Sequence, residues 1–352
     1  MKKALISGIT GQDGAYLARH LLDNGYEVYG TYRRTSTPNF WRLDYLGIFD
    51  KINLISADIT DFSSILDAIK TSQADEIYHL AAQSFVRASY ESPIATANID
   101  GISVLNFLEA IRLHDESTKF YFAGTSEMYG QSVQYQKMKL NEESPFNPVS
   151  PYATAKLYGY WTTRIYRESY KLFSVSGILF NHESPLRGLE FVTRKISNEI
   201  ARIHLGLSKE LRLGNMDSKR DWGYAPEYVE GMHLMLNSKT PKDYVLATGE
   251  SHSVREFVEE GFKLIGKDPE KYVKSDKTFR RHIDFDLVLG DSSKAQKELG
   301  WKPKTSFREL VKIMVNEDIR RWEKWQKGER FSFDAPYYKE MEMKKRGREV
   351  LE

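Results

Sequence analysis

The sequence predicts an α/β fold built on a doubly wound parallel sheet, accompanied by a smaller α/β domain that is discontinuous in sequence. Two observations lead to this prediction. Short apolar runs alternate with segments of helical periodicity through residues 1–182, and apolar runs become sparse after about residue 182. Alternation of this kind is typical of parallel strands that helices cover on both faces.

The first unit runs from strand to helix to strand. Residues 3–8 form a short apolar run, and in the segment that follows Leu17, Leu21 and Leu22 share one helical face. Gly25 stands where a helix C-cap is expected. The same alternation continues in strand-like runs at 26–32, 52–59, 76–82, 120–126 and 173–181 and helix-like segments at 61–70, 93–112 and 150–170.

The chain divides into three parts by composition. We expect residues 1–182 to form the domain with the large sheet, completed by segments around 220–250. Residues 183–330, with loops of clustered charge, are expected to form mainly the smaller domain, which binds the substrate. Residues 331–352 form a highly charged C-terminal tail.

Composition excludes several classes of function. The 51 basic and 49 acidic residues give a net charge of +2, which disfavours a nucleic-acid partner. The absence of cysteine excludes disulfides, thiolate metal sites and a cysteine nucleophile. We expect no metal, because no pair of histidines has metal-ligand spacing. No uninterrupted apolar run approaches about 18 residues, so we expect a cytoplasmic protein without a membrane partner.

Three glycines mark the first turn. Gly8, Gly11 and Gly14 follow the first strand and open the first helix, where backbone N–H groups and the positive helix end can receive a pyrophosphate. The spacing is G-x-x-G-x-x-G rather than G-x-G-x-x-G. An ordinary tight turn is the alternative.

The end of the second strand indicates which dinucleotide is bound. Arg33 and Arg34 stand where an acidic residue would bind an adenosine ribose 2′-hydroxyl. Two guanidiniums suit a 2′-phosphate, so we expect NADP rather than NAD; a solvated basic loop is the alternative. Asp58, after the third strand, either accepts a hydrogen bond from the adenine amino group or caps the following helix.

The strongest local signal for chemistry is a tyrosine and a lysine four residues apart. On a helix, Tyr152 and Lys156 share one face, so the ammonium is expected to lower the phenol pKa and the pair can deprotonate an alcohol. Thr125, Ser126 and Glu127 follow a predicted strand whose carboxyl end should face the same ligand.

At this point the chain resembles a known family. Gly8, Gly11 and Gly14, with Tyr152 and Lys156, are ordered and spaced as in the extended short-chain dehydrogenase/reductases, which have a Rossmann-like fold. More narrowly, the chain is similar to the GDP-mannose 4,6-dehydratase family from roughly residue 4 to residue 304. The segments that carry this likeness are "GITGQDG", "HLAAQS", "TSEMYG", "SPYATAKLYGYW", "ILFNHESP", "FVTRKI", "LGNMDSKRDWG", "VLATGESHSVREFV" and "DLVLGDSSKAQKELGWKP".

The resemblance implies a lyase reaction without net oxidation. C4 of the hexose is oxidised, the C5 proton is removed, the C6 hydroxyl leaves as water, and a bound NADP returns the hydride to C6. Tyr152 with Lys156 would act as the base at C4, and Thr125 would hydrogen-bond the C4 oxygen. Glu127 would take the C5 proton and help the C6 hydroxyl to leave. A simple reductase has no need of that carboxylate.

The resemblance also implies the binding residues. The cofactor-binding set comprises Gly8, Gly11, Gln12, Asp13, Gly14, Arg33, Arg34, Asp58, Ile59, Leu80, Ala81, Tyr152, Lys156 and His182. The set that binds a GDP-sugar comprises Ser84, Thr125, Ser126, Glu127, Asn181, Val192, Lys195, Arg220, Arg281 and Asp284. A homodimer or homotetramer is implied as well, with the segment 33–42 near a subunit contact.

Three departures from the family pattern keep alternatives open. Phe85 stands where the family usually has histidine, Leu186 and Leu189 replace polar residues, and Asp284 replaces glutamate. GDP-mannose and GDP-manno-heptose are therefore both candidate substrates. Another nucleotide-sugar dehydratase or epimerase, or a non-catalytic NADP-binding sensor, are the alternative functions.

Overall fold

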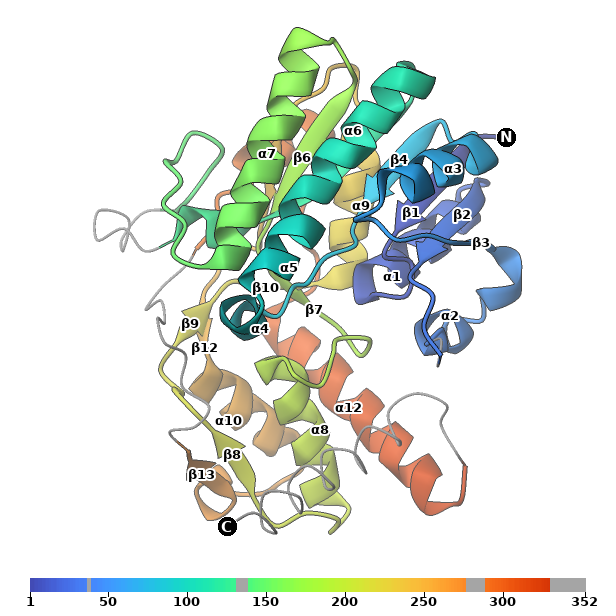
Figure 1. Cartoon of the computed structure of the whole chain (residues 1–352). Helices are drawn as coiled ribbons and strands as arrows, with labels where there is room; N and C mark the ends of the chain where they lie inside the picture. The colour runs from blue at the N-terminus through green and yellow to red at the C-terminus, as the bar shows by residue number, and fades with distance from the viewer. Residues whose placement is uncertain (37–38, 131–138, 277–288, 330–352) are drawn as a thin grey trace.

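A seven-stranded parallel sheet forms the centre of the molecule (Figure 1). The computed structural model describes residues 1–36, 39–130, 139–276 and 289–329. In spatial order the strands are β11 (Tyr244–Leu246), β6 (Ser174–Leu179), β5 (Lys119–Thr125), β4 (Glu76–His79), β1 (Lys3–Ser7), β2 (Glu27–Tyr32) and β3 (Asn53–Ser56).

The strand order is that of a doubly wound sheet. From β1 the chain winds outward to β3, and then returns to β4 and winds outward to β11 on the other side. Every neighbouring pair is parallel, with Ser7 opposite both Thr31 and His79. The predicted fold class is therefore confirmed, and the crossover between β1 and β4 places a ligand crevice at their carboxyl ends.

Helices cover both faces of this sheet. They are α1 (Gln12–Asp23), α2 (Trp41–Tyr45), α3 (Phe62–Ser72), α4 (Val86–Glu91), α5 (Pro93–Ala97), α6 (Ser103–His114), α7 (Pro151–Ser169), α9 (Ala225–Leu236) and α11 (Ser293–Leu299). Short helical turns lie at η1 (Phe49–Lys51), η2 (Asn98–Ile102) and η3 (Ser126–Tyr129).

Alternating side chains of each strand enter two different cores. Ala4 and Ile6 pack in the cluster that includes α1 and α9, whereas Leu5 packs in the cluster that includes α3, α6 and α7. This period of two follows from strand geometry. In α1, Leu17 and Leu21 are buried, as their helical spacing predicts, and Gly25 ends the turn with a φ of 78°.

A third apolar cluster lies beyond the carboxyl ends of the strands. It is formed chiefly by α8 (Val192–His204), α10 (Val254–Leu264) and α12 (Phe307–Gln326), which Figure 1 shows below the large sheet. The short strands here pair as β7 (Asn181–Glu183) with β10 (Trp222–Tyr224), β9 (Lys219–Arg220) with β12 (His252–Ser253), and β8 (Leu211–Leu213) with β13 (Val273–Ser275). The helical turn η5 (Pro269–Lys271) lies just before β13 in the chain.

The domain boundaries stay a prediction. The strand β11 belongs to the large sheet, and the helix α9 belongs to the layer that covers it. The pair formed by β7 and β10 lies between this sheet and the third apolar cluster, because β10 contacts both α9 and α12. The predicted tail at 331–352 lies outside the described residues.

One helical stretch is long and apolar enough to cross a membrane by length and composition. It spans Pro93–His114, and half of its most apolar window is buried inside the molecule. The side of α6 that contacts α3 and α7 is the buried part of this stretch. Packing in the core therefore accounts for its apolar character.

Candidate active site

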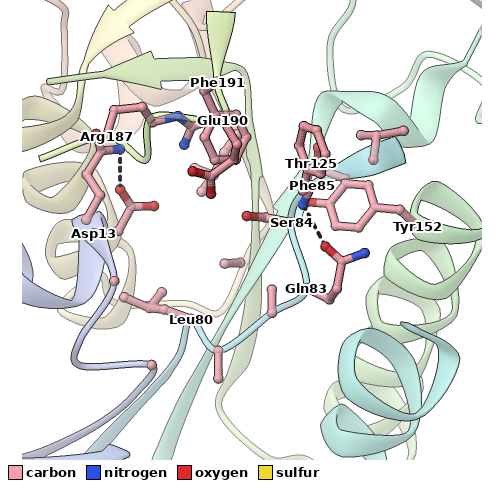
Figure 2. A pocket seen from close by; sticks show the side chains of 18 of the residues that line it. Asp13, Leu80, Gln83, Ser84, Phe85, Thr125, Tyr152, Arg187, Glu190 and Phe191 are labelled. Atoms are coloured by element: carbon pink, nitrogen blue, oxygen red, sulfur yellow. Dashed lines mark hydrogen bonds between the residues drawn. The ribbon is translucent and has the colours of Figure 1, made fainter. Parts of the chain in front are cut away.

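A cavity of about 1190 Å³ opens at the carboxyl ends of the strands, between the large sheet and the cluster of α8 (Figure 2). It collects nearly all of the predicted site residues that the structure describes. Those that line it are Gly8, Gly11, Gln12, Asp13, Gly14, Arg33, Asp58, Ile59, Leu80, Ala81, Ser84, Thr125, Ser126, Glu127, Tyr152, Lys156, Asn181, His182, Val192, Lys195 and Arg220.

One predicted residue that the structure describes is not in that wall. Arg34 is described and exposed, but it does not line the cavity. Arg281 and Asp284 lie outside the described residues.

The glycine turn packs so closely against neighbouring backbone that larger residues cannot fit there. Gly8 has a φ of 75°, and a Cβ on it would lie 2.7 Å from the backbone nitrogen of Ala81. A Cβ on Gly14 would lie 2.3 Å from the carbonyl oxygen of Gly8. Gly11 is the N-cap of α1 and has no side chain that could make a capping bond, so the helix N-terminus faces the cavity. This cradle fits a dinucleotide pyrophosphate.

Polar side chains fix the start of α1. Asp13 Oδ2 lies 2.8 Å from Nε2 of the His182 imidazole, and the amide of Gln12 donates to the His182 carbonyl at 3.1 Å. Although burial alone would raise it, the facing His182 holds the pKa of the Asp13 carboxyl below its usual value, and the pKa of His182 is correspondingly raised. This pair holds the glycine turn against β7.

The ends of β1 and β4 are joined through one serine. Ser7 Oγ accepts hydrogen bonds from the backbone N–H groups of Leu80 and Ala81, each at 3.2 Å, and lies 2.7 Å from His79 Nδ1. His79 is fully buried and bonds on its other side to Ser103 at 2.9 Å. These contacts give His79 a structural role at the ends of β1 and β4.

Asp58 is predicted from the sequence either to bind the adenine amino group or to cap the following helix α3. The cap of α3 is Asp61, which accepts from the backbone N–H groups of Ser63 and Ser64. Asp58 instead accepts from the backbone and hydroxyl of Thr60, and these bonds hold the pKa of its carboxyl low. The capping alternative for Asp58 is therefore wrong, and its carboxylate lies on the cavity wall with Arg33.

Tyr152 and Lys156 lie in the first two turns of α7, both buried. Ser150 caps this helix by accepting from the N–H of Ala153, and Pro151 occupies the first turn. The Lys156 ammonium donates to the Ala123 carbonyl at 3.0 Å and lies 4.9 Å from the Phe122 ring centroid. It therefore lies between α7 and the end of β5.

The charge environment of Tyr152 differs from the expectation. Burial raises the pKa of the Tyr152 phenol, whereas hydrogen bonding to Thr125 and the positive charge of Arg187 oppose that rise. The expected lowering of the phenol pKa is not found in the structure. Burial also lowers the pKa of the Lys156 ammonium, because a buried cation loses hydration.

The end of β5 brings two more functional side chains to Tyr152. Thr125 caps the turn η3, and its Oγ1 accepts the N–H of Glu127 at 3.2 Å. Thr125 and Ser126 are buried, whereas Glu127 is half-buried. A phenol, a hydroxyl and a carboxylate thus share one wall, which is sufficient for two separate proton transfers.

Sequence reasoning missed two charged residues, of which Asp100 is buried behind the cavity wall and Arg187 lines it. Asp100 is fully buried on η2, and its Oδ1 accepts the N–H of Gln83 at 2.8 Å. Its carboxyl acts on both Tyr152 and Lys156. Burial raises the pKa of Asp100 to about 6. An acid between two apolar helical segments was a signal that could have identified it.

Arg187 is the second missed residue. Its guanidinium stacks on the Phe191 ring at 3.6 Å from the centroid, and its charge acts on Asp13 and Tyr152. Figure 2 shows Arg187, Glu190 and Phe191 on the wall opposite Tyr152. The neighbouring quoted motif "NHESP" gave no indication that this side chain would enter the cavity.

The predicted nucleotide end lies near α8 and β9. Lys195 is in the first turn of α8, and burial lowers the pKa of its ammonium to about 8. Arg220 is buried and donates to the Lys219 carbonyl at 2.7 Å and to Ser218 Oγ at 3.2 Å. Two cations therefore face one end of the cavity, as an anionic diphosphate requires.

The family departures fall in different places. Phe85 lines the cavity and meets Phe191 edge to face, with centroids 6.0 Å apart. Leu186 is fully buried in the core with α1 and α9, and Leu189 is outside the cavity wall. Of the departures that the structure describes, only Phe85 alters the site directly.

The doubly wound sheet, the glycine cradle and the Tyr152–Lys156 pair define the class of the extended short-chain dehydrogenase/reductases. A family model described as GDP-mannose 4,6 dehydratase matches residues 5–314. The chain belongs to the GDP-mannose 4,6-dehydratase family.

Similar proteins agree with this assignment. The GDP-mannose 4,6 dehydratase of Cricetulus griseus is 46% identical over 343 residues, which cover 90% of this chain and 91% of that protein. The GDP-mannose 4,6-dehydratase of Sinorhizobium fredii is 47% identical, with 90% and 97% covered. The solved dTDP-glucose 4,6-dehydratase of Bacillus anthracis superposes with a TM-score of 0.79 at 19% identity, over 93% of this chain and 99% of that one, which shows the shared fold.

Proposed function

We propose that the protein converts GDP-mannose to GDP-4-keto-6-deoxymannose and water, as a hydro-lyase. Membership of the GDP-mannose 4,6-dehydratase family supports this reaction. The observation that carries the proposal is Glu127 in the same cavity as Thr125 and Tyr152. An epimerase or a ketoreductase needs a base at C4 only, whereas the elimination needs a second acid/base group near C5 and C6.

The cofactor of the proposed reaction is NADP. The cradle at Gly8 and Gly14 would hold its pyrophosphate, Arg33 and Asp58 would meet its adenosine end, and Tyr152 with Lys156 would meet its nicotinamide end. When bound, it takes a hydride from C4 and returns one to C6. Arg33 favours NADP over NAD because a guanidinium can pair with the 2′-phosphate.

The protein side chains divide the proton transfers. Tyr152 takes the proton of the C4 hydroxyl, and Thr125 holds the C4 oxygen by a hydrogen bond. Because burial raises the pKa of this phenol, its deprotonation depends on nearby positive charge. Arg187 acts on the phenol in the structure, and the Lys156 ammonium, one turn further along α7, would add to this charge in the reaction. Glu127 removes the C5 proton, which the adjacent ketone has acidified, and then protonates the departing C6 hydroxyl.

The nucleotide end of the substrate is assigned to the region around α8. Val192 and Lys195 would contact the guanine, Asn181 the sugar or diphosphate, and Arg220 the diphosphate. Arg281 and Asp284 stay predicted substrate residues outside the described part of the chain.

A second candidate substrate is GDP-manno-heptose. Phe85 stands in the cavity wall where the family usually has histidine, and with Phe191 it makes that wall apolar. This change lies beside Ser84 and the proposed sugar site, so a C6-extended sugar is the natural alternative to mannose.

We also propose a homo-oligomer. Tyr158, Trp161 and Ile165 form an exposed apolar stripe along α7, each at least 43% exposed. Ile94 and Ile102 expose further apolar surface on the adjoining α5 and η2. A stripe of this kind suits an isologous contact between two copies of α7, in a homodimer or within a homotetramer.

The division of labour along the chain follows the cavity. Residues 1–182, completed by segments around 220–250, would form the NADP-binding domain, and residues 183–330 mainly the domain for the GDP-sugar. We propose that the enzyme acts in the cytoplasm, in keeping with a multiply charged substrate and cofactor.

The test is mass spectrometry of separate incubations with GDP-mannose and GDP-manno-heptose. The proposal predicts a product lighter than GDP-mannose by one water, formed without added oxidant. Preferential loss of water from the heptose would favour the second substrate. Loss of water from neither would contradict the dehydratase proposal.

A further inference from the structure

Three consecutive backbone carbonyls after β7 are each bound by an arginine from elsewhere in the chain. The Pro185 carbonyl accepts from Arg194 and from Arg321, each at 2.8 Å. The Leu186 carbonyl accepts from Arg42 at 2.7 Å, and the Arg187 carbonyl accepts from Arg194 at 3.0 Å. The three arginines come from α2, α8 and α12.

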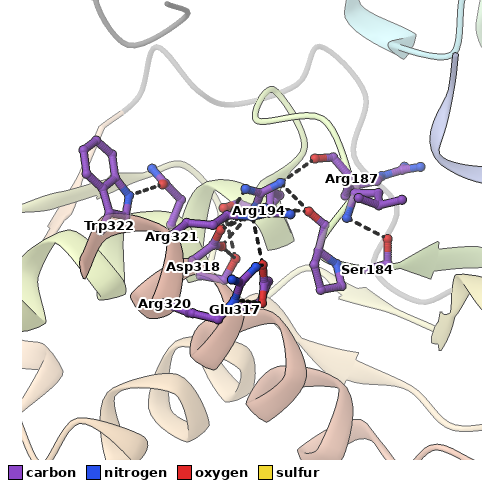
Figure 3. Close-up of polar contacts among 12 residues, drawn as sticks. Ser184, Arg187, Arg194, Glu317, Asp318, Arg320, Arg321 and Trp322 are labelled. Atoms are coloured by element: carbon purple, nitrogen blue, oxygen red, sulfur yellow. Dashed lines mark hydrogen bonds and ion pairs between the residues drawn. The ribbon is translucent and has the colours of Figure 1, made fainter. Parts of the chain in front are cut away.

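One carboxylate on α12 organises this group. Figure 3 shows Asp318 facing Arg194, whose Nη2 and Nε donate to it at 2.7 and 3.0 Å. Asp318 also accepts from Ser197 Oγ at 2.6 Å and lies 3.4 Å from Arg321. Arg194 is 0% and Asp318 1% exposed, so this is a buried ion pair.

A buried ion pair of this kind contributes little net stability, because removing both charges from water costs about as much as their attraction returns. Its geometric effect is larger. A planar guanidinium that binds one carboxylate and two carbonyls at once fixes the relative positions of all three. Arg194 therefore fixes the backbone of residues 185–187 relative to α12.

The same backbone carries side chains that reach the cavity. Arg187, Glu190 and Phe191 line it, and Lys195 directly follows Arg194 on α8. Arg42 adds a connection to the cofactor turn, because it donates to the Thr10 carbonyl at 3.0 Å as well as to Leu186. No residue of α12, which the structure describes completely, lines the cavity.

We propose that Arg42, Arg194, Arg321 and Asp318 form an arginine clamp that positions the segment 185–191, and through it Arg187 and Lys195, for binding of the GDP-sugar. The clamp residues are positioning residues, since none of them needs to touch the substrate. This inference rests on the proposed function. It makes α12 a determinant of substrate affinity, although the helix lies outside the cavity wall.

The test compares the NADP-loaded wild type with D318N and R194K, measuring GDP-mannose binding by calorimetry, KM and kcat, and cofactor content. Both variants are expected to weaken GDP-mannose binding at least about tenfold and to raise KM, with the bound NADP unchanged, since small displacements of positioning groups have large effects. R194K is informative because it keeps the charge but loses the planar fork.

The matched control is D243N. Asp243 forms a two-point ion pair with Arg167, at 2.8 and 2.6 Å, which is mostly buried, and neither residue lines the cavity. We expect D243N to lower the melting temperature without weakening GDP-mannose binding. Equal weakening in D243N and D318N would overturn the clamp in favour of general destabilisation.

A second variant decides the matter if D318N does not fold. R42M keeps an aliphatic side chain against Trp41 but removes the bonds to Thr10 and Leu186. It should also weaken GDP-mannose binding several-fold. Wild-type affinity for GDP-mannose in both R42M and R194K would overturn the clamp proposal but leave the proposed function intact. A wild-type protein that does not bind GDP-mannose would contradict both proposals.

Discussion

Glu127 and Tyr152 differ in burial within one cavity wall, and this difference suits two different proton transfers. Tyr152 is buried beside Thr125, where a phenol remains protonated until positive charge assists it. Glu127 lies on the turn η3 and is only half-buried, so solvent reaches it. The proposed assignment of C4 chemistry to Tyr152 and of C5 and C6 chemistry to Glu127 is consistent with these positions.

Replacing Glu127 by glutamine should separate the two halves of the reaction. We expect elimination to slow by roughly 10²- to 10⁴-fold, the usual contribution of a positioned acid/base group, while oxidation at C4 survives. The readout is a burst of reduced-nicotinamide absorbance on adding GDP-mannose, with little exchange of the C5 proton in deuterated water. Unimpaired C5 exchange would remove Glu127 from the base role.

Asp100 gives the fold a pH dependence that can be predicted in sign. Its pKa in the folded chain is about 6, against an ordinary value of 3.8, because burial disfavours the carboxylate. A raised pKa contributes stability that is present at low pH and is lost as the pH rises through about 6. The difference of about two pH units corresponds to about 3 kcal/mol as an upper bound.

D100N removes that titration. Relative to wild type, its free energy of unfolding should therefore increase between about pH 4.5 and about pH 8, by up to about 2 kcal/mol. Denaturant unfolding of both proteins at the two pH values measures this difference. A difference between the two proteins that does not change with pH would show that Asp100 does not titrate in this range.

At the scale of elements, the two neighbouring arginines that follow β2 have different positions relative to the cavity. Arg33 lines the cavity and Arg34 does not, although both are exposed and adjacent in sequence. The residue that contacts a 2′-phosphate is therefore expected to be Arg33, and the contribution of Arg34 to be smaller.

The variants R33D and R34D make the same change of charge at these two positions. R33D should reduce the preference for NADP over NAD by at least about tenfold, the effect of losing one charge-assisted hydrogen bond, and R34D should reduce it less. Binding titrations with both dinucleotides on stripped protein measure the preference. An unchanged preference in R33D would contradict the assignment of the adenosine end.

The elements themselves could largely be predicted from the sequence, because each depends on local patterns. The glycine turn and the cap before Tyr152 are short motifs with a physical cause, and the structure has both. Leu186 shows where this reasoning fails: it lies in a motif beside the site, yet its side chain points into the core. The direction of a loop side chain depends on contacts that are distant in sequence.

The missed residues have the same explanation. Arg187 enters the cavity because arginines from α2, α8 and α12 hold the carbonyls around it, and Arg42 and Arg321 lie far from it in sequence. Asp100 becomes an active-site charge because η2 packs on α7. Residues of this kind are identified by tertiary contacts, which spacing along one chain does not contain.

At the scale of the whole molecule, the exposed stripe on α7 leads to a prediction about assembly. W161D should break the contact between two copies of α7 and lower the mass of the assembly about twofold, because a charge in an apolar isologous contact faces its own copy. Trp325, which is 44% exposed against 45% for Trp161, is the matched control, and W325D should leave the mass unchanged. Light scattering measures both, and an oligomer that persists in W161D would exclude this face of α7.

The central claim is that one cavity carries out oxidation, elimination and reduction on the same sugar. The most direct test uses GDP-mannose with deuterium at C4 and locates the label in the product by NMR. The account predicts that the deuterium is found at C6 of the 4-keto-6-deoxy product, in the same molecule, with no added reductant. Loss of the label to solvent or to an external nicotinamide pool, or a product that still carries its C6 hydroxyl, would contradict the account.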